Sequence, residues 1–142
     1  MEPTVVIVPG LRDHVPDHWQ TLLAARLPNA RTVPRMTPAS ATKLSCDAWV
    51  DMLDCSLATI DAPVVLVAHS AGAVIVAHWA KRHRRAITGA LLATPADVER
   101  PLGAGYPTTE TLEHNGWLPI PREPLPFPSI VAASSNDPLG GF

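Results

Sequence analysis

Short apolar runs rich in β-branched residues alternate along the chain with segments whose apolar residues recur at helical spacing. The runs predict strands at residues 4–8, 31–33, 64–67, 87–92 and 129–132. Such alternation is typical of β-α-β units, so the sequence predicts an α/β fold with a doubly wound, mostly parallel sheet. The run at 64–67 is apolar on both faces, which predicts a central strand covered by helices on both sides.

Two amphipathic helices are predicted between the first three strands. The first opens at Pro16-Asp17, and its predicted apolar face consists of Trp19, Leu22, Leu23 and Leu27. The second has Ser45 as its expected N-cap. Its predicted buried residues, which share helical spacing, are Cys46, Trp49, Val50, Leu53, Leu57 and Ile60. We expect both helices to pack on the sheet.

Residues 94–128 interrupt the alternation with eight prolines. So many prolines predict neither regular helix nor sheet, and we expect this flap to run over one edge of the sheet. The flap also carries apolar residues, namely Tyr106, Trp117, Leu118 and Phe127. These anchors predict an ordered flap rather than a disordered linker.

Length and composition favour one domain spanning residues 1–142, because 46% of these residues are hydrophobic and can bury a core. The formal charge of -2 argues against nucleic acid as a partner. No apolar run approaches the roughly 20 residues of a membrane span, and the first residues lack the basic region of a signal peptide, so no membrane partner is expected. Cys46 and Cys55 lie nine residues apart in one predicted helix, too far to pair, and their prediction as free thiols favours a cytoplasmic location.

The candidate chemistry begins at Ala68-His69-Ser70-Ala71-Gly72, directly after the central strand and directly before a helical run. A nucleophile elbow needs this context, because its serine must project above the sheet from a tight strand-to-helix turn with small flanking residues. Ser70 is therefore the candidate nucleophile. The alternative is that Ser70 merely caps the following helix.

Two backbone N–H groups are candidate oxyanion donors. Ala71 follows the serine at the N-terminus of the next helix, where N–H groups and the helix dipole favour negative charge. Leu11 lies in the loop after the first strand, which supplies the second donor in such sites. The alternative for Pro9-Gly10-Leu11 is an ordinary turn at the end of a strand. This loop lacks the glycines that cradle a pyrophosphate, which argues against a nucleotide-binding domain.

Taken together, Val8-Pro9-Gly10-Leu11, His18-Trp19, Ala68 to Gly72 and the late Ser134-Ser135-Asn136-Asp137-Pro138 resemble the small serine hydrolases of the retinoblastoma-binding protein 9 and YdeN type. The resemblance runs over essentially the whole chain. It implies an α/β-hydrolase-like three-layer sandwich, a Ser-Asp-His triad in that chain order, a small-molecule substrate, and neither a metal nor an organic cofactor. It assigns Ser70 as nucleophile and Asp137 as the triad acid. Independently, Asp137 lies beyond the carboxyl end of a strand, where α/β folds place their chemistry, although a simple turn role is the alternative.

The chain departs from this family after the acid, because no histidine follows Asp137. The expectation is an α/β-hydrolase domain that lacks its C-terminal elements, with the strand at 129–132 left as an uncovered edge. His14 and His18 come closest to the site, and His69 adjoins the serine, so we predict that these three histidines line the substrate pocket. A role of His14 or His18 as the base, or as metal ligands beside Asp13 and Asp17, is an alternative.

The sequence thus predicts a serine hydrolase that acts on a small ester, thioester or amide through Ser70, with Asp137 as orienter and the triad histidine missing from the chain. The second hypothesis is a catalytically inactive, truncated hydrolase-like protein that acts by binding or interaction. The substrate and the oligomeric state cannot be derived from the sequence.

Overall fold

The computed structural model describes residues 1–11, 16–34 and 44–140. They form one five-stranded sheet in the order β2-β1-β3-β4-β5, in which each neighbouring pair is parallel. The strands are β1 (Thr4–Val8), β2 (Ala30–Thr32), β3 (Val64–His69), β4 (Gly89–Ala93) and β5 (Ser129–Ala132). The helices are α1 (Trp19–Arg26), α2 (Cys46–Ala58), α3 (Ala71–Arg82) and α4 (Thr109–His114). The predicted α/β fold with a parallel sheet is confirmed.

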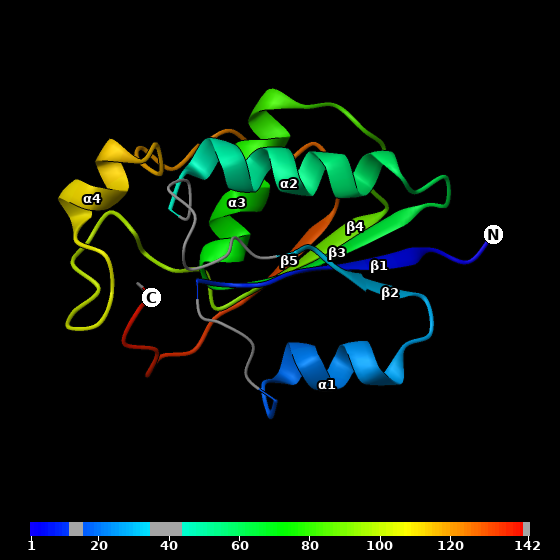
Figure 1. The fold of residues 1–142 in the computed structure, drawn as a ribbon, viewed down its shortest axis with the longest axis horizontal. Coiled ribbons are helices and arrows are strands. Elements are labelled where there is room, and N and C mark those ends of the chain that lie inside the picture. The colour runs from blue at the N-terminus through cyan, green and yellow to red at the C-terminus, as the bar shows by residue number, and fades with distance from the viewer. Residues whose placement is uncertain (12–15, 35–43, 141–142) are drawn as a thin grey trace.

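Helices cover the sheet on both faces, with α2 and α3 on one side and α1 on the other (Figure 1). This arrangement follows from right-handed crossovers, because the chain leaves β1 in one direction and β3 in the opposite direction. Residues in β1 and β3 alternate between the two faces. Val6, Val8 and Leu66 belong to the main core cluster with α2 and α3, whereas Ile7 is buried outside that cluster. β3 is central, as predicted.

Helix α2 matches its prediction closely. The Ser45 side chain accepts a hydrogen bond from the Ala48 backbone N–H and caps the helix. Every residue of the predicted apolar face is buried: Cys46, Trp49, Val50, Leu53, Leu57 and Ile60. Cys46 and Cys55 are both free, and burial raises the pKa of the Cys46 thiol to about 11, so this thiol stays protonated as part of the core.

Helix α1 begins at Trp19 rather than at the predicted Pro16-Asp17, and its predicted buried face is partly wrong. The helix begins after His18, which is its N-cap, and its one fully buried residue is the polar Gln20. Leu22, predicted to face the sheet, is 47% exposed. Gln20 lies two positions, or about 200° of helical turn, from Leu22, so burying one turns the other toward solvent.

The flap at residues 94–128 is ordered, as predicted. Val98, Leu112, Trp117 and Phe127 are buried in the core. The prediction that the flap lacks regular structure is wrong at one place, because α4 occupies residues 109–114. This helix lies between Pro107 and Pro119, in the longest proline-free stretch of the flap, and Thr108 caps it by accepting from the Thr111 N–H.

Strand β5 is the last strand at one edge of the described sheet. All four of its residues are exposed, and its apolar side chains Ile130 and Val131 are 69% and 61% exposed. An edge strand with exposed apolar side chains offers unpaired backbone groups to another polypeptide. The predicted uncovered edge is therefore present within the part of the chain that the structure describes.

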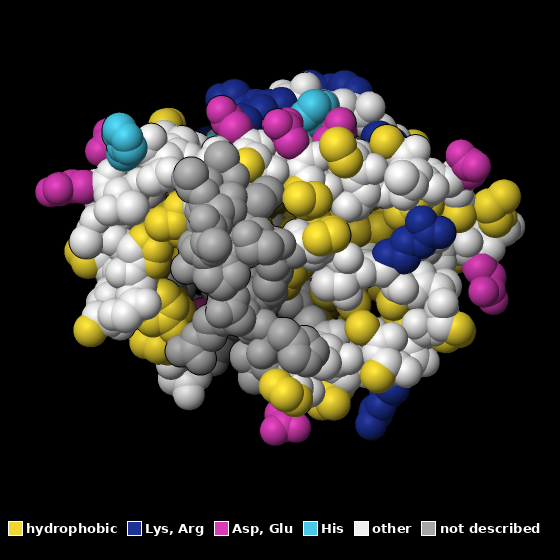
Figure 2. Space-filling model, viewed as in Figure 1, with side chains coloured by type: hydrophobic (Ala, Val, Ile, Leu, Met, Phe, Trp, Pro, Cys, Tyr) yellow, Lys and Arg dark blue, Asp and Glu magenta, His cyan; other side chains and the backbone are white. Residues whose placement is uncertain are grey.

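Figure 2 shows acidic and basic side chains side by side along the top of the molecule, where Figure 1 shows α2 and α3. No large basic patch covers the described part of the face that is shown. In the described residues, none of the helices combines the length and the apolar character needed to cross a membrane. The expectation that nucleic acid is not a partner stays a prediction.

A buried histidine on α3 predicts acid sensitivity of the fold. His78 is 5% exposed, and its Nε2 lies 3.0 Å from the backbone oxygen of Trp117, to which it donates. Burial lowers the pKa of His78 below its ordinary value of 6.5. Below about pH 6.5 the unfolded chain therefore binds a proton that the folded chain does not, so stability is fully present above this pH and falls as the pH is lowered.

Urea denaturation between pH 7.5 and pH 5 checks this prediction in the wild type and in His78→Gln. Glutamine keeps an N–H donor for the Trp117 carbonyl but does not titrate. We expect the denaturation midpoint of the wild type to fall more steeply with acid than that of the variant. Parallel pH profiles would show that other groups cause the acid sensitivity.

Candidate active site

Ser70 lies in a tight turn between the central strand β3 and helix α3. Its backbone has φ 55° and ψ -121°, a conformation that non-glycine residues rarely adopt and that costs on the order of 1–3 kcal/mol. The Ser70 N–H donates to the Ala93 carbonyl oxygen of β4 at 3.0 Å, which fixes the turn against the neighbouring strand. Ser70 occupies the N-cap position of α3, but its side chain makes no capping hydrogen bond to the helix, which argues against the alternative of a simple helix cap.

Two glycines allow the backbone to approach this turn closely. A Cβ atom at Gly72 would lie 2.4 Å from the Val8 carbonyl oxygen and 2.6 Å from that of Pro9, so only glycine fits between α3 and the end of β1. A Cβ atom at Gly10 would lie 3.3 Å from Cβ of Ser70. The loop after β1 and the serine turn are therefore in direct contact.

This contact brings the two predicted oxyanion donors to one site. Leu11 follows Gly10 in the loop after β1, and Ala71 is the first residue of α3. Both residues line the cavity that also exposes Ser70. Backbone N–H groups at this position, one of them at a helix N-terminus, favour negative charge that develops next to the serine.

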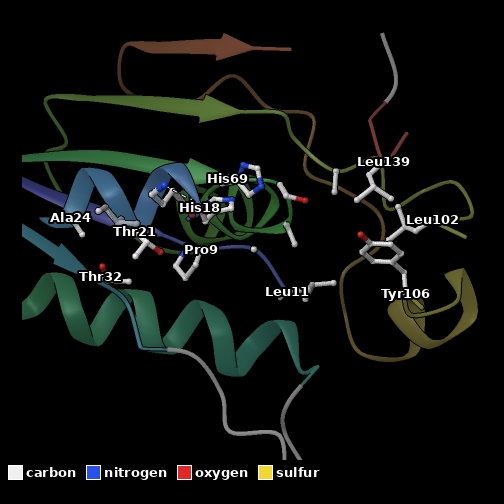
Figure 3. Close-up of a pocket in the computed structure, with 16 residues that line it drawn as sticks. Pro9, Leu11, His18, Thr21, Ala24, Thr32, His69, Leu102, Tyr106 and Leu139 are labelled. Carbon is white, nitrogen blue, oxygen red and sulfur yellow. Dashed lines mark hydrogen bonds between the residues drawn. The ribbon is translucent and has the colours of Figure 1, made fainter. Parts of the chain in front are cut away.

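The cavity has a volume of about 520 Å³, within the usual range for small-molecule sites. Figure 3 shows its two arms, with Thr21, Ala24 and Thr32 on the side of α1 and β2, and Leu102, Tyr106 and Leu139 on the side of the flap. Pro9, Leu11, His18 and His69 lie between the arms (Figure 3). None of the described residues lining the cavity is Asp, Glu, Lys or Arg.

Of the three predicted pocket histidines, His18 and His69 both line the cavity. Their rings meet edge to face, with centroids 4.5 Å apart. His14 lies outside the described residues. The other histidines lie elsewhere, with His78 buried under the flap, His83 at the end of α3 and His114 at the end of α4.

Hydrogen bonds set the tautomers of the two pocket histidines. The Trp19 indole N–H donates to Nδ1 of His69 at 3.3 Å, and the Gln20 backbone N–H donates to Nδ1 of His18 at 3.2 Å. An indole or amide nitrogen can only donate, so Nδ1 accepts in both rings. Each neutral ring therefore carries its proton on Nε2, and neither ring in this arrangement offers a lone pair for a proton from Ser70.

Thr94 adjoins the site at the end of β4, and no sequence pattern pointed to it. Its φ is 42°, an outlier for a β-branched residue. Its hydroxyl lies 3.3 Å from Nδ1 of His69, and its N–H donates to the Ala132 carbonyl oxygen of β5. Residues with positive φ thus follow two adjacent strands, Ser70 after β3 and Thr94 after β4. His69, the last residue of β3, contacts Thr94.

Asp137 lies in the loop after β5. Its carboxylate accepts a hydrogen bond from the Leu139 N–H at 3.0 Å, which is an Asx turn. The Leu139 carbonyl in turn accepts from the Asp97 N–H, so this loop is tied to the loop after β4, and Leu139 lines the cavity. Asp137 itself is not a lining residue of the cavity. Asp137 therefore has a turn role, in which Oδ1 is the carboxylate oxygen that accepts from Leu139.

No group of three or more His, Cys, Asp or Glu side chains within the described ranges could hold a metal ion. Asp17 and His18 are described, whereas the proposed partners Asp13 and His14 lie outside those ranges.

Comparison with known proteins agrees with this geometry. The profile of the serine hydrolase family matches residues 5–142, nearly the whole chain. The chain belongs to the serine hydrolase family. A solved structure of a YdeN-like hydrolase from Pectobacterium atrosepticum is similar, with 29% sequence identity and a TM-score of 0.78. The match covers 99% of this chain and 68% of that chain. Among curated proteins, none matches.

Membership in this family confirms the predicted resemblance and the α/β-hydrolase type of fold. It also shows that the chain is of the hydrolase class.

Proposed function

We propose that the chain acts on a small ester, thioester or amide, with Ser70 as the nucleophile. The observation that carries this proposal is the conformation of Ser70, which has φ 55° between β3 and α3, lines a cavity and makes no side-chain capping hydrogen bond to the helix. Strain of this kind persists where the surrounding structure enforces it, and it projects the hydroxyl into the site. The uncharged lining of the described cavity supports a substrate without a charged group near the reacting bond.

In this proposal the Ser70 oxygen attacks the substrate carbonyl carbon, and the carbonyl oxygen becomes an oxyanion. The backbone N–H groups of Leu11 and Ala71 stabilise that oxyanion. The base accepts the Ser70 proton and gives it to the alcohol, thiol or amine that leaves as the intermediate collapses. Water then gives a proton to the base and attacks the acyl group, which releases the acid and restores the Ser70 hydroxyl. Asp137 is the group that orients the base.

The base is the missing part of the proposal. The sequence has no histidine after Asp137. The neutral ring of His18 points its lone pair at the Gln20 backbone N–H of α1, and that of His69 points its lone pair at the Trp19 indole N–H. We therefore propose that neither His18 nor His69 acts as the base of Ser70, and that the residues after Asp137 in this sequence do not supply it. His14 lies outside the described residues. A serine hydroxyl without a base is a weak nucleophile, so we expect these 142 residues by themselves to react slowly, with oxyanion stabilisation retained.

A cytoplasmic location and a small-molecule substrate complete the proposal. The free thiols of Cys46 and Cys55 are typical of a reducing compartment. The family suggests small-molecule substrates, and the cavity of about 520 Å³ has a suitable size for one.

Intact-mass spectrometry after exposure to a fluorophosphonate tests the nucleophile. Attack by the Ser70 oxygen on phosphorus expels fluoride and leaves one phosphonyl adduct. We expect slow addition of one adduct to the wild type and none to Ser70→Ala. Ser56→Ala is the matched control, because Ser56 donates to the Met52 carbonyl oxygen within α2 and should not affect labelling.

Added imidazole tests the missing base in the same experiment. A small external base can enter an open site and accept the serine proton, so imidazole should accelerate labelling of the wild type but not of Ser70→Ala. Fast labelling that imidazole leaves unchanged would contradict the missing base. A folded sample that stays unlabelled with and without imidazole would refute the nucleophile and favour the binding or interaction protein.

A further inference from the structure

Gln20 lines the candidate cavity and joins the carboxyl ends of two central strands. It lies in the first turn of α1 and is 4% exposed. Its side-chain Nε2 donates to the Val8 carbonyl oxygen of β1 at 3.2 Å and to the Val67 carbonyl oxygen of β3 at 3.1 Å. A carboxamide nitrogen carries two hydrogens, so one group serves both strands at once.

The two strands that Gln20 joins are those between which the chain order of the sheet reverses. From β1 the chain crosses to β2 on one side, and from β3 it crosses to β4 on the other. α/β proteins bind their ligands in the crevice at such a switch point. Leu11 follows Val8 by three residues and Ala71 follows Val67 by four, so the two candidate oxyanion donors come from the two strand ends that Gln20 connects.

The strand ends are also held from other directions. The Val8 carbonyl is in close contact with Gly72 of α3, where even a Cβ atom would not fit. Trp19, which precedes Gln20, donates to His69 at the end of β3. Val8 pairs with Ala68 in the parallel ladder between β1 and β3. At the end of this ladder the Val8 carbonyl is held further by the Gln20 carboxamide on the α1 side, and α3 packs on the opposite side (Figure 1).

We infer that Gln20 is a positioning residue that sets the separation between the backbone N–H groups of Leu11 and Ala71. The inference takes the oxyanion role of these groups from the proposed function, but the link between Gln20 and their positions stands without it. No other residue type of similar length offers two hydrogens on one neutral atom. Glutamate would place oxygens against two carbonyl oxygens, and methionine would leave both carbonyls without this donor.

The test compares Gln20→Met with Asn29→Leu. Asn29 is a matched control, because its Nδ2 donates to the Pro3 carbonyl oxygen at the opposite end of β1. The readouts are the backbone amide ¹H–¹⁵N chemical shifts of Leu11 and Ala71 and the rate of fluorophosphonate labelling in the presence of imidazole. Gln20→Asn, which keeps the amide on a shorter stem, gives the same comparison if Gln20→Met does not fold.

In the Gln20 variant we expect both amide resonances to move and the labelling rate to fall on the order of tenfold to a hundredfold, with neither change in Asn29→Leu. Unchanged amide resonances in the folded Gln20 variant would overturn the inference. If the resonances move but the wild type is never labelled, the positioning role holds and the proposed nucleophile fails.

Discussion

Replacing Gly72 by alanine is expected to destabilise the chain by more than about 3 kcal/mol, because the added methyl group overpacks a site made of backbone. The new Cβ would lie 2.4 Å from the Val8 carbonyl oxygen and 2.6 Å from the Pro9 carbonyl oxygen. Neither neighbour is the end of a flexible side chain, so α3 or the end of β1 must move. The helix that begins directly after Ser70 would separate from the loop that carries Leu11.

Urea denaturation followed by far-ultraviolet circular dichroism measures this effect, with Gly89→Ala as control. A Cβ atom at Gly89 would meet only the Pro128 carbonyl oxygen, at 3.5 Å, which is ordinary contact. We expect the control to change the free energy of unfolding by less than about 1 kcal/mol, because alanine also restricts the unfolded chain. Equal effects of both substitutions would contradict the close approach at Gly72.

The strands were predicted best where the sequence itself limits them. The observed bounds of β1 and β5 equal the predicted runs, since Pro9 and Pro128 stand directly beside them. In β3 the prediction stopped at Val67, but the strand continues to His69. Ala68 and His69 have weak strand propensity, and their pairing with β4 is a property of the sheet that no local pattern shows.

Helix α1 shows why hydrophobic periodicity was insufficient at the site. The rule assigns apolar residues to the buried face and so selected Leu22. The structure instead buries Gln20, because two carbonyl groups at the strand ends satisfy its carboxamide. A polar residue within an otherwise apolar helical face was the available signal, but its partners lie 12 and 47 residues away in sequence.

The turn around Ser70 was predictable because its requirements are local: a strand, small neighbours and a helix follow one another in the chain. The surroundings of His69 were not. Its contacts come from Trp19 and Thr94, which are 50 and 25 residues distant, and the positive φ of Thr94 has no sequence signature for a threonine. Local sequence thus predicts the candidate nucleophile, whereas tertiary contacts decide which groups orient and surround it.

The flap depends most strongly on Trp117, which has no exposed surface. Its indole N–H donates to the Leu44 carbonyl oxygen at 2.6 Å, and its ring meets that of Trp49 edge to face. Its backbone oxygen accepts from His78 of α3. One residue of the flap therefore contacts the start of α2 and the middle of α3.

Trp117→Ala is expected to destabilise the chain by about 3–5 kcal/mol, since it removes a fully buried aromatic side chain and leaves a cavity. Trp117→Phe keeps an aromatic ring but loses the donor to Leu44, and we expect a smaller loss of about 1–3 kcal/mol. Urea denaturation gives both values, with Leu22→Ala as an exposed control. A loss below about 1 kcal/mol for Trp117→Ala would contradict the anchoring role.

The slope of the same denaturation curves distinguishes two ways in which the flap can fail. If the flap and the sheet unfold together, Trp117→Ala lowers the midpoint and leaves the slope unchanged. If the flap detaches first, the slope decreases, because part of the surface is already exposed before the main transition. We expect the unchanged slope, because Val98, Leu112 and Phe127 of the flap belong to the same buried cluster as α2 and α3. The cavity arm formed by Leu102 and Tyr106 would then persist only as long as the whole fold does.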